Sequence, residues 1–237
     1  MLAINNFPPC GFGNRVLYYY NLRQKAHDNN IDFYCVPWEG YQYFKGDMLG
    51  KRPTDDNYKI LDFCLGEEFY SYNGISTRDV FQLKNTFNVN PDTCAVHFRG
   101  TDFHAWNPDS ILKYQYYCDS IEEIKDKVTN FVLFTDDNNL PSYKKVVSYL
   151  NFNNIKYFVG ENTHDRRSYI NDFTYMTECD WVISSPSTFC ISAGAIGKRK
   201  NIIHSKEWIE NRLAKKDKFW VDLYNGGNDN YKLWRII

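Results

Sequence analysis

The chain has 237 residues, 43% of them hydrophobic and 24% charged, which is ordinary for a globular protein. This length allows one large domain or two small ones with their own cores. The net charge of −1 excludes a strong general attraction to nucleic acid or to an anionic membrane.

No stretch of the sequence approaches the ~18 consecutive apolar residues that a membrane span needs. Seven widely spaced cysteines without a Cys-x-x-Cys motif predict neither a zinc site nor a disulfide framework. We therefore expect a cytoplasmic protein with reduced thiols and no integral membrane segment. Cys94 and Cys190 lie in apolar segments and are expected in the core.

The first half of the chain predicts a strand, a helix, a strand and a long loop. The expected ranges are residues 2–5, 14–29, 31–38 and 39–57. Residues 11–14, Gly-Phe-Gly-Asn, are expected to form the turn before the helix, and a further helix is expected over 77–87. Turn-forming residues at 88–92 then mark the best domain boundary. This gives an N-terminal α/β domain over residues 1–90 and a second domain over 91–237.

Strands and helices alternate regularly in the second half. The predicted strands are Thr93–Phe98, 131–134, 155–159, 181–184 and Asn201–His204. The predicted helices are 110–128, as one helix or a pair, and 140–150, 169–179 and 187–196. Such alternation is typical of βαβ units, which build a parallel sheet with helices on both faces. The expected fold class is therefore α/β, with a doubly wound sheet.

The strand Thr93–Phe98 runs into a polar turn, His-Phe-Arg-Gly-Thr-Asp at residues 97–102. Ligands of open α/β sheets bind at the carboxyl ends of strands, and a guanidinium there can hold a phosphate by two parallel hydrogen bonds. Strand alternation places His97 and Arg99 on one face. The alternative interpretation, about equally favoured by this turn alone, is that Arg99 pairs with Asp102 and only closes the turn.

Three other places could carry chemistry. Ser187 or Thr188 is expected to cap the helix that follows, and the same helix start could also bind an anion. The glycine pair at residues 11 and 13 is a weak signal, because the third glycine of the dinucleotide fingerprint is missing. Asp136-Asp137 at a strand end could hold a metal or a ribose or cap the next helix, and capping is the favoured interpretation.

In chain order, these motifs resemble one family. The turn at 11–14, the turn at 97–102 and the segment from Asp172 to Phe189 occur as in the fucosyltransferase superfamily, which contains α-1,2-, α-1,6- and protein O-fucosyltransferases. The late segment is most similar to the α-1,2 group, and residues 116–117 and 134–137 are also similar. The resemblance spans most of residues 11–208 and depends on the order and spacing of short motifs.

The resemblance implies a GT-B architecture, in which two Rossmann-like domains with mostly parallel sheets have a cleft between them. It also implies an inverting, metal-independent transfer of fucose from GDP-fucose to a glycan hydroxyl. The expected partners are a GDP-sugar donor and a glycan or glycolipid acceptor, with no nucleic acid and no cofactor besides the donor.

The resemblance also implies a role for each motif residue. Arg99 would hold the β-phosphate and stabilise the leaving GDP, while Ser187 and Thr188 would bind phosphate oxygens. Asp172 would read guanine, because one carboxylate can accept from both N1–H and the exocyclic amine. The remaining donor-binding residues are His97 beside the nucleoside and, from the facing domain, Gly11, Gly13 and Asn14.

The base that accepts the acceptor's proton is not identified by the sequence. Asp102, His104 and Asp109 follow the central motif as candidates, and Asp102 is taken as catalytic together with Arg99, although a structural role in the turn is as strongly favoured. Aromatic residues of the 38–51 loop, such as Trp38, could stack on a sugar or simply pack.

One position departs from the pattern. Many members of the α-1,2 and α-1,6 groups have two adjacent arginines, and here the second is Gly100. Arg15 could replace the missing charge across the cleft. Two alternatives therefore remain open: the same fold acting on another nucleotide sugar, against which Asp172 argues, and a protein that binds a nucleotide or glycan without catalysis.

Overall fold

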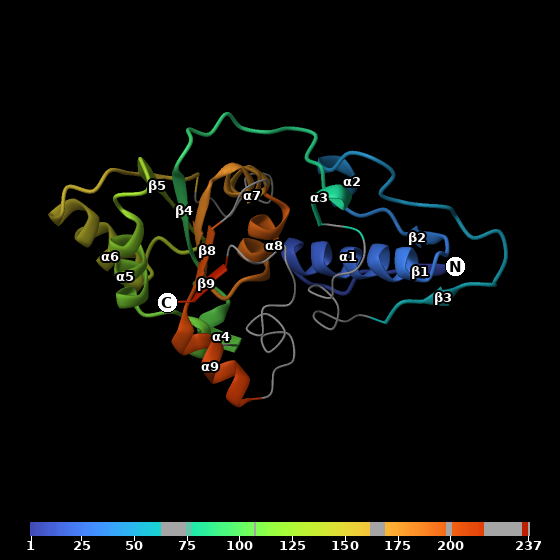
Figure 1. Cartoon of the computed structure of the whole chain (residues 1–237). Helices are drawn as coiled ribbons and strands as arrows, with labels where there is room; N and C mark the ends of the chain where they lie inside the picture. The colour runs from blue at the N-terminus through green and yellow to red at the C-terminus, as the bar shows by residue number, and fades with distance from the viewer. Residues whose placement is uncertain are drawn as a thin grey trace. The chain divides into compact units, whose positions relative to one another are not determined.

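The structure is a computed structural model, and it describes residues 1–62, 75, 77–106, 108–161, 169–197, 201–215 and 234–236. The chain forms two compact units (Figure 1). The smaller unit contains Met1–Asn85, and the larger contains Thr86–Lys215 and the strand at 234–236. The larger unit thus begins at Thr86, ahead of the turn where the sequence places the boundary.

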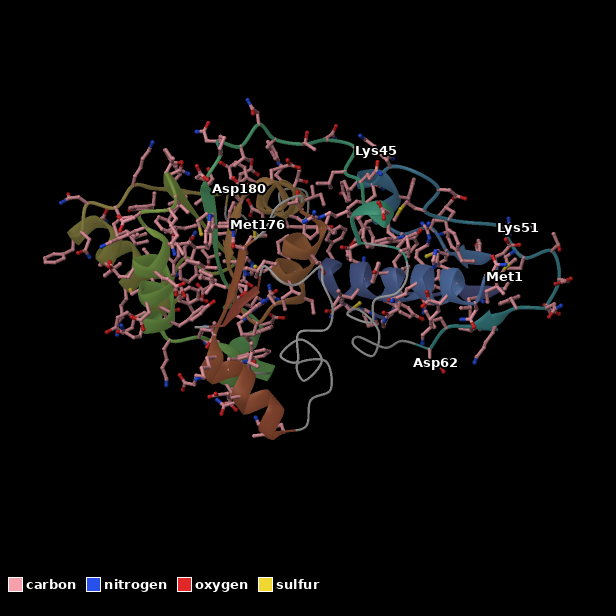
Figure 2. The ribbon with its side chains drawn as sticks, viewed as in Figure 1. Met1, Lys45, Lys51, Asp62, Met176 and Asp180 are labelled. Atoms are coloured by element: carbon pink, nitrogen blue, oxygen red, sulfur yellow. The ribbon has the colours of Figure 1, made fainter. Side chains whose placement is uncertain are left out.

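The smaller unit is a three-stranded parallel sheet with one long helix. Its elements are β1 (Leu2–Ile4), α1 (Phe12–Asp28), β2 (Phe33–Cys35), α2 (Gly40–Tyr43), β3 (Lys59–Ile60) and α3 (Thr77–Val80). The strand order is β2-β1-β3, so β1 lies in the centre. Met1 and Lys51 lie at this sheet (Figure 2), where Lys51 N–H donates to the Phe33 carbonyl at 2.9 Å.

Two predictions for this unit are corrected by the structure. The helix begins at Phe12 rather than after the expected turn, because the extended Gly11 is its N-cap and the Gly11 carbonyl accepts from Arg15 N–H at 3.2 Å. The helix expected over 77–87 is only α3, because the chain beyond it pairs instead: Leu83 forms a bridge with Phe44.

Aromatic side chains form the core of the smaller unit. Tyr19, Phe44 and Phe81 are fully buried, and the rings of Phe44 and Phe81 lie 4.9 Å apart. Trp38 is only 6% exposed and stacks on Phe7 with ring centroids 5.3 Å apart. Packing, rather than a sugar platform, is therefore the structural role of Trp38.

The larger unit is a six-stranded sheet among the described residues, and every pairing in it is parallel. Its strands are β4 (Thr93–Phe98), β5 (Asn130–Thr135), β6 (Tyr157–Val159), β7 (Trp181–Ile183), β8 (Asn201–His204) and β9 (Trp234–Ile236). They run in the order β6-β5-β4-β7-β8-β9, which is the Rossmann order when counting starts at β4.

Helices cover both faces of this sheet. They are α4 (Phe103–Trp106), α5 (Tyr114–Ile124), α6 (Pro141–Phe152), α7 (Tyr169–Glu178), α8 (Thr188–Ile196) and α9 (Lys206–Ala214). Figure 1 shows α5 and α6 on one side and α7 and α8 on the other, as right-handed crossovers require when strand order reverses. The prediction of a doubly wound α/β unit is confirmed.

Burial follows the predicted pattern in this sheet. All six residues of β4 and all six of β5 are buried, and Cys94 and Cys190 have no exposed surface. Met176 of α7 is equally buried, while Asp180 in the turn before β7 accepts from Asp92 N–H at 2.9 Å (Figure 2). None of the described helices is long and apolar enough to cross a membrane.

Candidate functional site

The candidate site lies at the carboxyl end of β4, where the strand order of the larger sheet reverses. The chain leaves β4 toward β5 and later returns to β7 on the opposite side of β4. Such switch points are where open α/β sheets bind ligands, since the loops diverge there. Across this point His97 Nδ1 and Ser185 Oγ are hydrogen-bonded at 2.7 Å, so β4 and the segment after β7 are tied together.

Arg99 follows β4 and is held by two carboxylates. Its NH2 lies 2.6 Å from Asp102 Oδ1, and its NH1 lies 2.5 Å from Asp136 Oδ2. The guanidinium carbon lies 5.1 Å from the centre of the Phe103 ring. The buried Nε has no hydrogen-bond partner among the described residues. The pairing with Asp102 that the sequence offered as an alternative is therefore present, and Asp136 adds a second ion pair.

Asp136 is a partner of Arg99 that sequence reasoning missed, because the sequence offered it only as a metal, ribose or capping residue. Besides Arg99, its carboxylate accepts from Gly100 N–H at 2.7 Å and from Thr101 Oγ1 at 2.8 Å. The prediction that it caps the next helix is wrong, because the N-cap of α6 is Leu140 and has no side-chain cap. The pairing depends on strand order and register: Phe98 pairs with Thr135, so the residues after both strands lie side by side.

Gly100 lies close to Asp137, next to the ion pairs of Arg99. A Cβ built on Gly100 would lie 2.8 Å from Asp137 Cβ, nearer than two such atoms can approach. An arginine at this position, as in many members of the resembled groups, would need the Asp137 segment to move. Asp137 is fixed by accepting from Asn139 N–H at 2.8 Å, and its Oδ2 also lies 3.6 Å from His104 Nε2.

The start of α8 lies on the other side of the switch point. Ser187 occupies the predicted N-cap position with extended backbone, but its side chain makes no capping hydrogen bond, so the capping role assigned to its hydroxyl is wrong. Its N–H instead donates to the Ser185 carbonyl at 2.7 Å in a tight turn. Thr188 is the first residue of the helix.

Phe189 joins the predicted motifs into one cluster. Its ring centroid lies 5.9 Å from that of His97, 5.2 Å from that of Phe173 and 6.2 Å from that of Tyr169. Asp172, half-buried in the first turn of α7, lies between the last two in sequence. The structure thus brings the α7 turn, the α8 start and the end of β4 together.

Burial controls the charge of both histidines at these strand ends. Burial lowers the pKa of His97 to about 4, with Arg99 acting in the same direction and Asp136 opposing it. Burial likewise lowers the pKa of His204 to about 3, and its Nδ1 lies 2.5 Å from Ser184 Oγ. Both imidazoles are therefore neutral near pH 7 and act as hydrogen-bonding groups rather than cations.

Gly11, Gly13 and Asn14 belong to the smaller unit. Gly11 is exposed, and Gly13 and Asn14 lie in the first turn of α1. Arg15 NH1 pairs with Glu39 Oε2 at 2.7 Å, so the charge suggested as a replacement for the missing arginine is balanced within this unit.

No group of three or more His, Cys, Asp or Glu residues that could hold a metal ion occurs in the described part of the chain. No protein-family model matches the chain, and comparison with curated proteins finds no match. Function must therefore be inferred from the residues and their geometry.

Proposed function

We propose that the protein is an inverting glycosyltransferase of GT-B architecture that moves fucose from GDP-fucose to a hydroxyl group of a glycan or glycolipid. One observation supports it above the others: an arginine and a helix start lie at the switch point of a sheet with Rossmann strand order. Both are groups that bind phosphate, and this is the edge where such sheets bind nucleotides.

The two carboxylates on Arg99 differ in exposure, and this suggests how a diphosphate could enter. The side chain of Asp102 is 53% exposed and that of Asp136 only 19%. Exposed ion pairs contribute little free energy, so the β-phosphate would displace Asp102 more easily than Asp136. In this proposal Asp136 keeps the guanidinium in position, while NH2 and the N-terminus of α8 bind the phosphate.

In the proposed reaction the acceptor oxygen attacks C1 of fucose on the face opposite the diphosphate. The bond from C1 to the β-phosphate oxygen breaks, and its electron pair leaves with GDP. Asp102, released from Arg99 by the phosphate, takes the proton of the acceptor hydroxyl. Arg99 and the α8 N–H groups stabilise the negative charge that grows on GDP, so the proposal assigns no metal to this step.

The nucleotide preference is proposed to come from Asp172. Its carboxylate can accept from N1–H and the exocyclic amine of guanine, a donor pair that adenine and uracil lack. The ring contacts of Phe189 with Tyr169 and Phe173 keep this turn of α7 next to the start of α8. A base bound at Asp172 and a diphosphate bound at Thr188 would then belong to one ligand.

Thermal unfolding with GDP, UDP and ADP tests the donor. We expect GDP alone to raise the melting temperature, since a ligand at a hundred times its Kd adds about 2.7 kcal/mol of stability. The Arg99→Ala variant should lose most of this shift, and Arg52→Ala, an exposed arginine of the smaller unit, should keep it.

Stabilisation by UDP alone would contradict the guanine assignment. Stabilisation by GDP without hydrolysis of GDP-fucose or transfer to any acceptor of a glycan panel would instead favour a nucleotide-binding protein without catalysis. The Arg99–Asp102 pair supports this second candidate, because it neutralises the proposed clamp.

A further inference from the structure

A recess of about 450 Å³ lies in the larger unit, outside the Arg99 cluster. Its walls are the segment from Asp109 to Asp119, which carries the start of α5, and the segment from Ser205 to Asn211, which carries the start of α9. This volume lies within the ~300–1,000 Å³ range that is usual for small-molecule sites.

Long-range contacts hold the two walls together. Lys113 Nζ pairs with Glu207 Oε1 at 2.6 Å, and Trp208 Nε1 donates to Ser110 Oγ at 3.1 Å. Trp208 is itself buried. The recess is therefore built by contacts between segments about 90 residues apart in sequence, and not by one mobile loop.

The recess lies on the same edge of the sheet as Arg99. Ser205 directly follows the last residue of β8, and the other wall follows the turn after β4. Tyr116, which lines the recess, bonds through its hydroxyl to the carbonyls of Ser184 at 2.9 Å and Ile203 at 2.8 Å. Ser184 directly precedes Ser185, which is hydrogen-bonded to His97. Neighbouring residues therefore contact the recess-lining Tyr116 and the candidate site.

The lining suits a neutral ligand rich in hydroxyl groups. Four carboxylates and two ammonium groups line the recess, and Lys215 pairs with one of the carboxylates, Asp109, at 3.6 Å. A small excess of negative charge remains, which disfavours phosphate. The amides of Gln115 and Asn211 add donors and acceptors, and each hydroxyl of a sugar can both donate and accept. Ile111 and Tyr116, both half-buried, supply apolar surface for the C–H face of a sugar ring.

We propose that this recess binds a saccharide unit, and that the unit belongs to the acceptor glycan. The second part rests on the proposed function, while saccharide binding stands without it. The acceptor would then be bound by the larger unit, in addition to the first-half loop that the sequence suggested.

Saturation-transfer NMR on the full chain, with lactose, maltose and chitobiose as probes, tests this. We expect saturation transfer to at least one disaccharide. Asn211→Ala removes an amide partner and should weaken the affinity for that disaccharide about tenfold. Gln115→Trp fills the recess and should abolish the transfer. Asn151→Ala, an exposed asparagine on α6, is the matched control and should bind as the wild type. The folded state of each variant is checked by its melting temperature.

The absence of transfer to all three disaccharides, or transfer unchanged in Gln115→Trp, would overturn the inference. Its failure is distinguishable from failure of the proposed function, because GDP stabilisation depends on Arg99 and not on Asn211. If the chain binds a disaccharide but is not stabilised by GDP, the recess is a saccharide site and the inference that it binds the acceptor is overturned.

Discussion

The two units carry the same ion pair at corresponding places. In each, an arginine that follows the first strand pairs with a carboxylate that follows the second strand: Arg15 with Glu39 in the smaller unit, and Arg99 with Asp136 in the larger. Both arginine side chains are 28% exposed, and the Nε of both is buried without a partner among the described residues.

The difference lies in what surrounds each arginine. Arg15 belongs to the first turn of the 17-residue helix α1 and has one carboxylate partner among the described residues, so this pair joins a helix to a loop. Arg99 precedes the four-residue α4 and has a second, exposed partner in Asp102. The same pairing thus joins two elements in the smaller unit, whereas in the larger unit it leaves an exposed partner, the one that the phosphate displaces in the proposed function.

Replacing the two arginines should give the largest contrast. Arg99→Ala should slow the hydrolysis of GDP-fucose by a factor that corresponds to ~2–4 kcal/mol, the usual effect of removing one donor from a developing charge. Arg15→Ala should lower the rate much less, since Arg15 pairs with Glu39 and the proposal assigns it no contact with the phosphate. Release of GDP measures both rates, and equal losses would erase the proposed distinction between the units.

Acid should destabilise the larger unit first. The pKa values of His97 and His204 are lowered from 6.5 to about 4 and about 3, so the stability that their neutral forms give is present above about pH 6.5 and lost as the pH falls. At about pH 5.5 each should cost on the order of 1 kcal/mol. Hydrogen exchange of peptides from the two units measures this, and His97→Gln should reduce the loss whereas the exposed His27→Gln should not.

Replacing the carboxylate of each ion pair should give a smaller difference, measured in the free energy of unfolding. Asp136→Asn weakens an ion pair and two further hydrogen bonds, so we expect about 1–2 kcal/mol lower stability. Glu39→Gln removes one half-exposed pair and should cost under about 1 kcal/mol. Urea unfolding gives both values. An equal cost for the two variants would mean that the extra bonds of Asp136 contribute nothing measurable.

Replacing a glycine in each unit, Gly100 or Gly11, should give the smallest difference in stability. Gly100→Ala places a methyl group 2.8 Å from Asp137 Cβ and should cost about 1 kcal/mol. Gly11→Ala meets nothing within 4 Å, so it should cost only the preference of an N-cap for glycine over alanine, about 0.5 kcal/mol. Melting temperatures compare them, and a neutral Gly100→Ala would show that the segment around Asp137 yields easily.

The larger sheet could be predicted from the sequence because its strands are apolar runs separated by amphipathic helices. Thr93–Phe98 and Asn201–His204 were predicted to the residue. The smaller unit was less predictable, since its strands have only two or three residues and its core comes from aromatic rings far apart in sequence. The short α4 and α9 also escaped prediction, because neither has a clear apolar period.

Within the candidate site, the sequence predicted which segments lie at the strand ends but not which side chains meet there. The choice of Asp102 as the partner of Arg99 needed only a three-residue spacing. The pairs with Asp136 and between His97 and Ser185 depend on strand order, which sequence periodicity does not give. Ser187 shows the converse: residue type and position predicted a cap, and Ser187 occupies the N-cap position, but its side chain makes no capping hydrogen bond.

The buried cysteines give each unit its own reporter of opening. Cys35 lies inside the smaller unit, and Cys94 and Cys190 lie inside the larger, all without exposed surface and with pKa values raised by burial. A thiol reagent can reach them only when the surrounding unit opens, because buried thiols are protonated and shielded. Alkylation followed peptide by peptide therefore yields two separate opening rates from one unmodified chain.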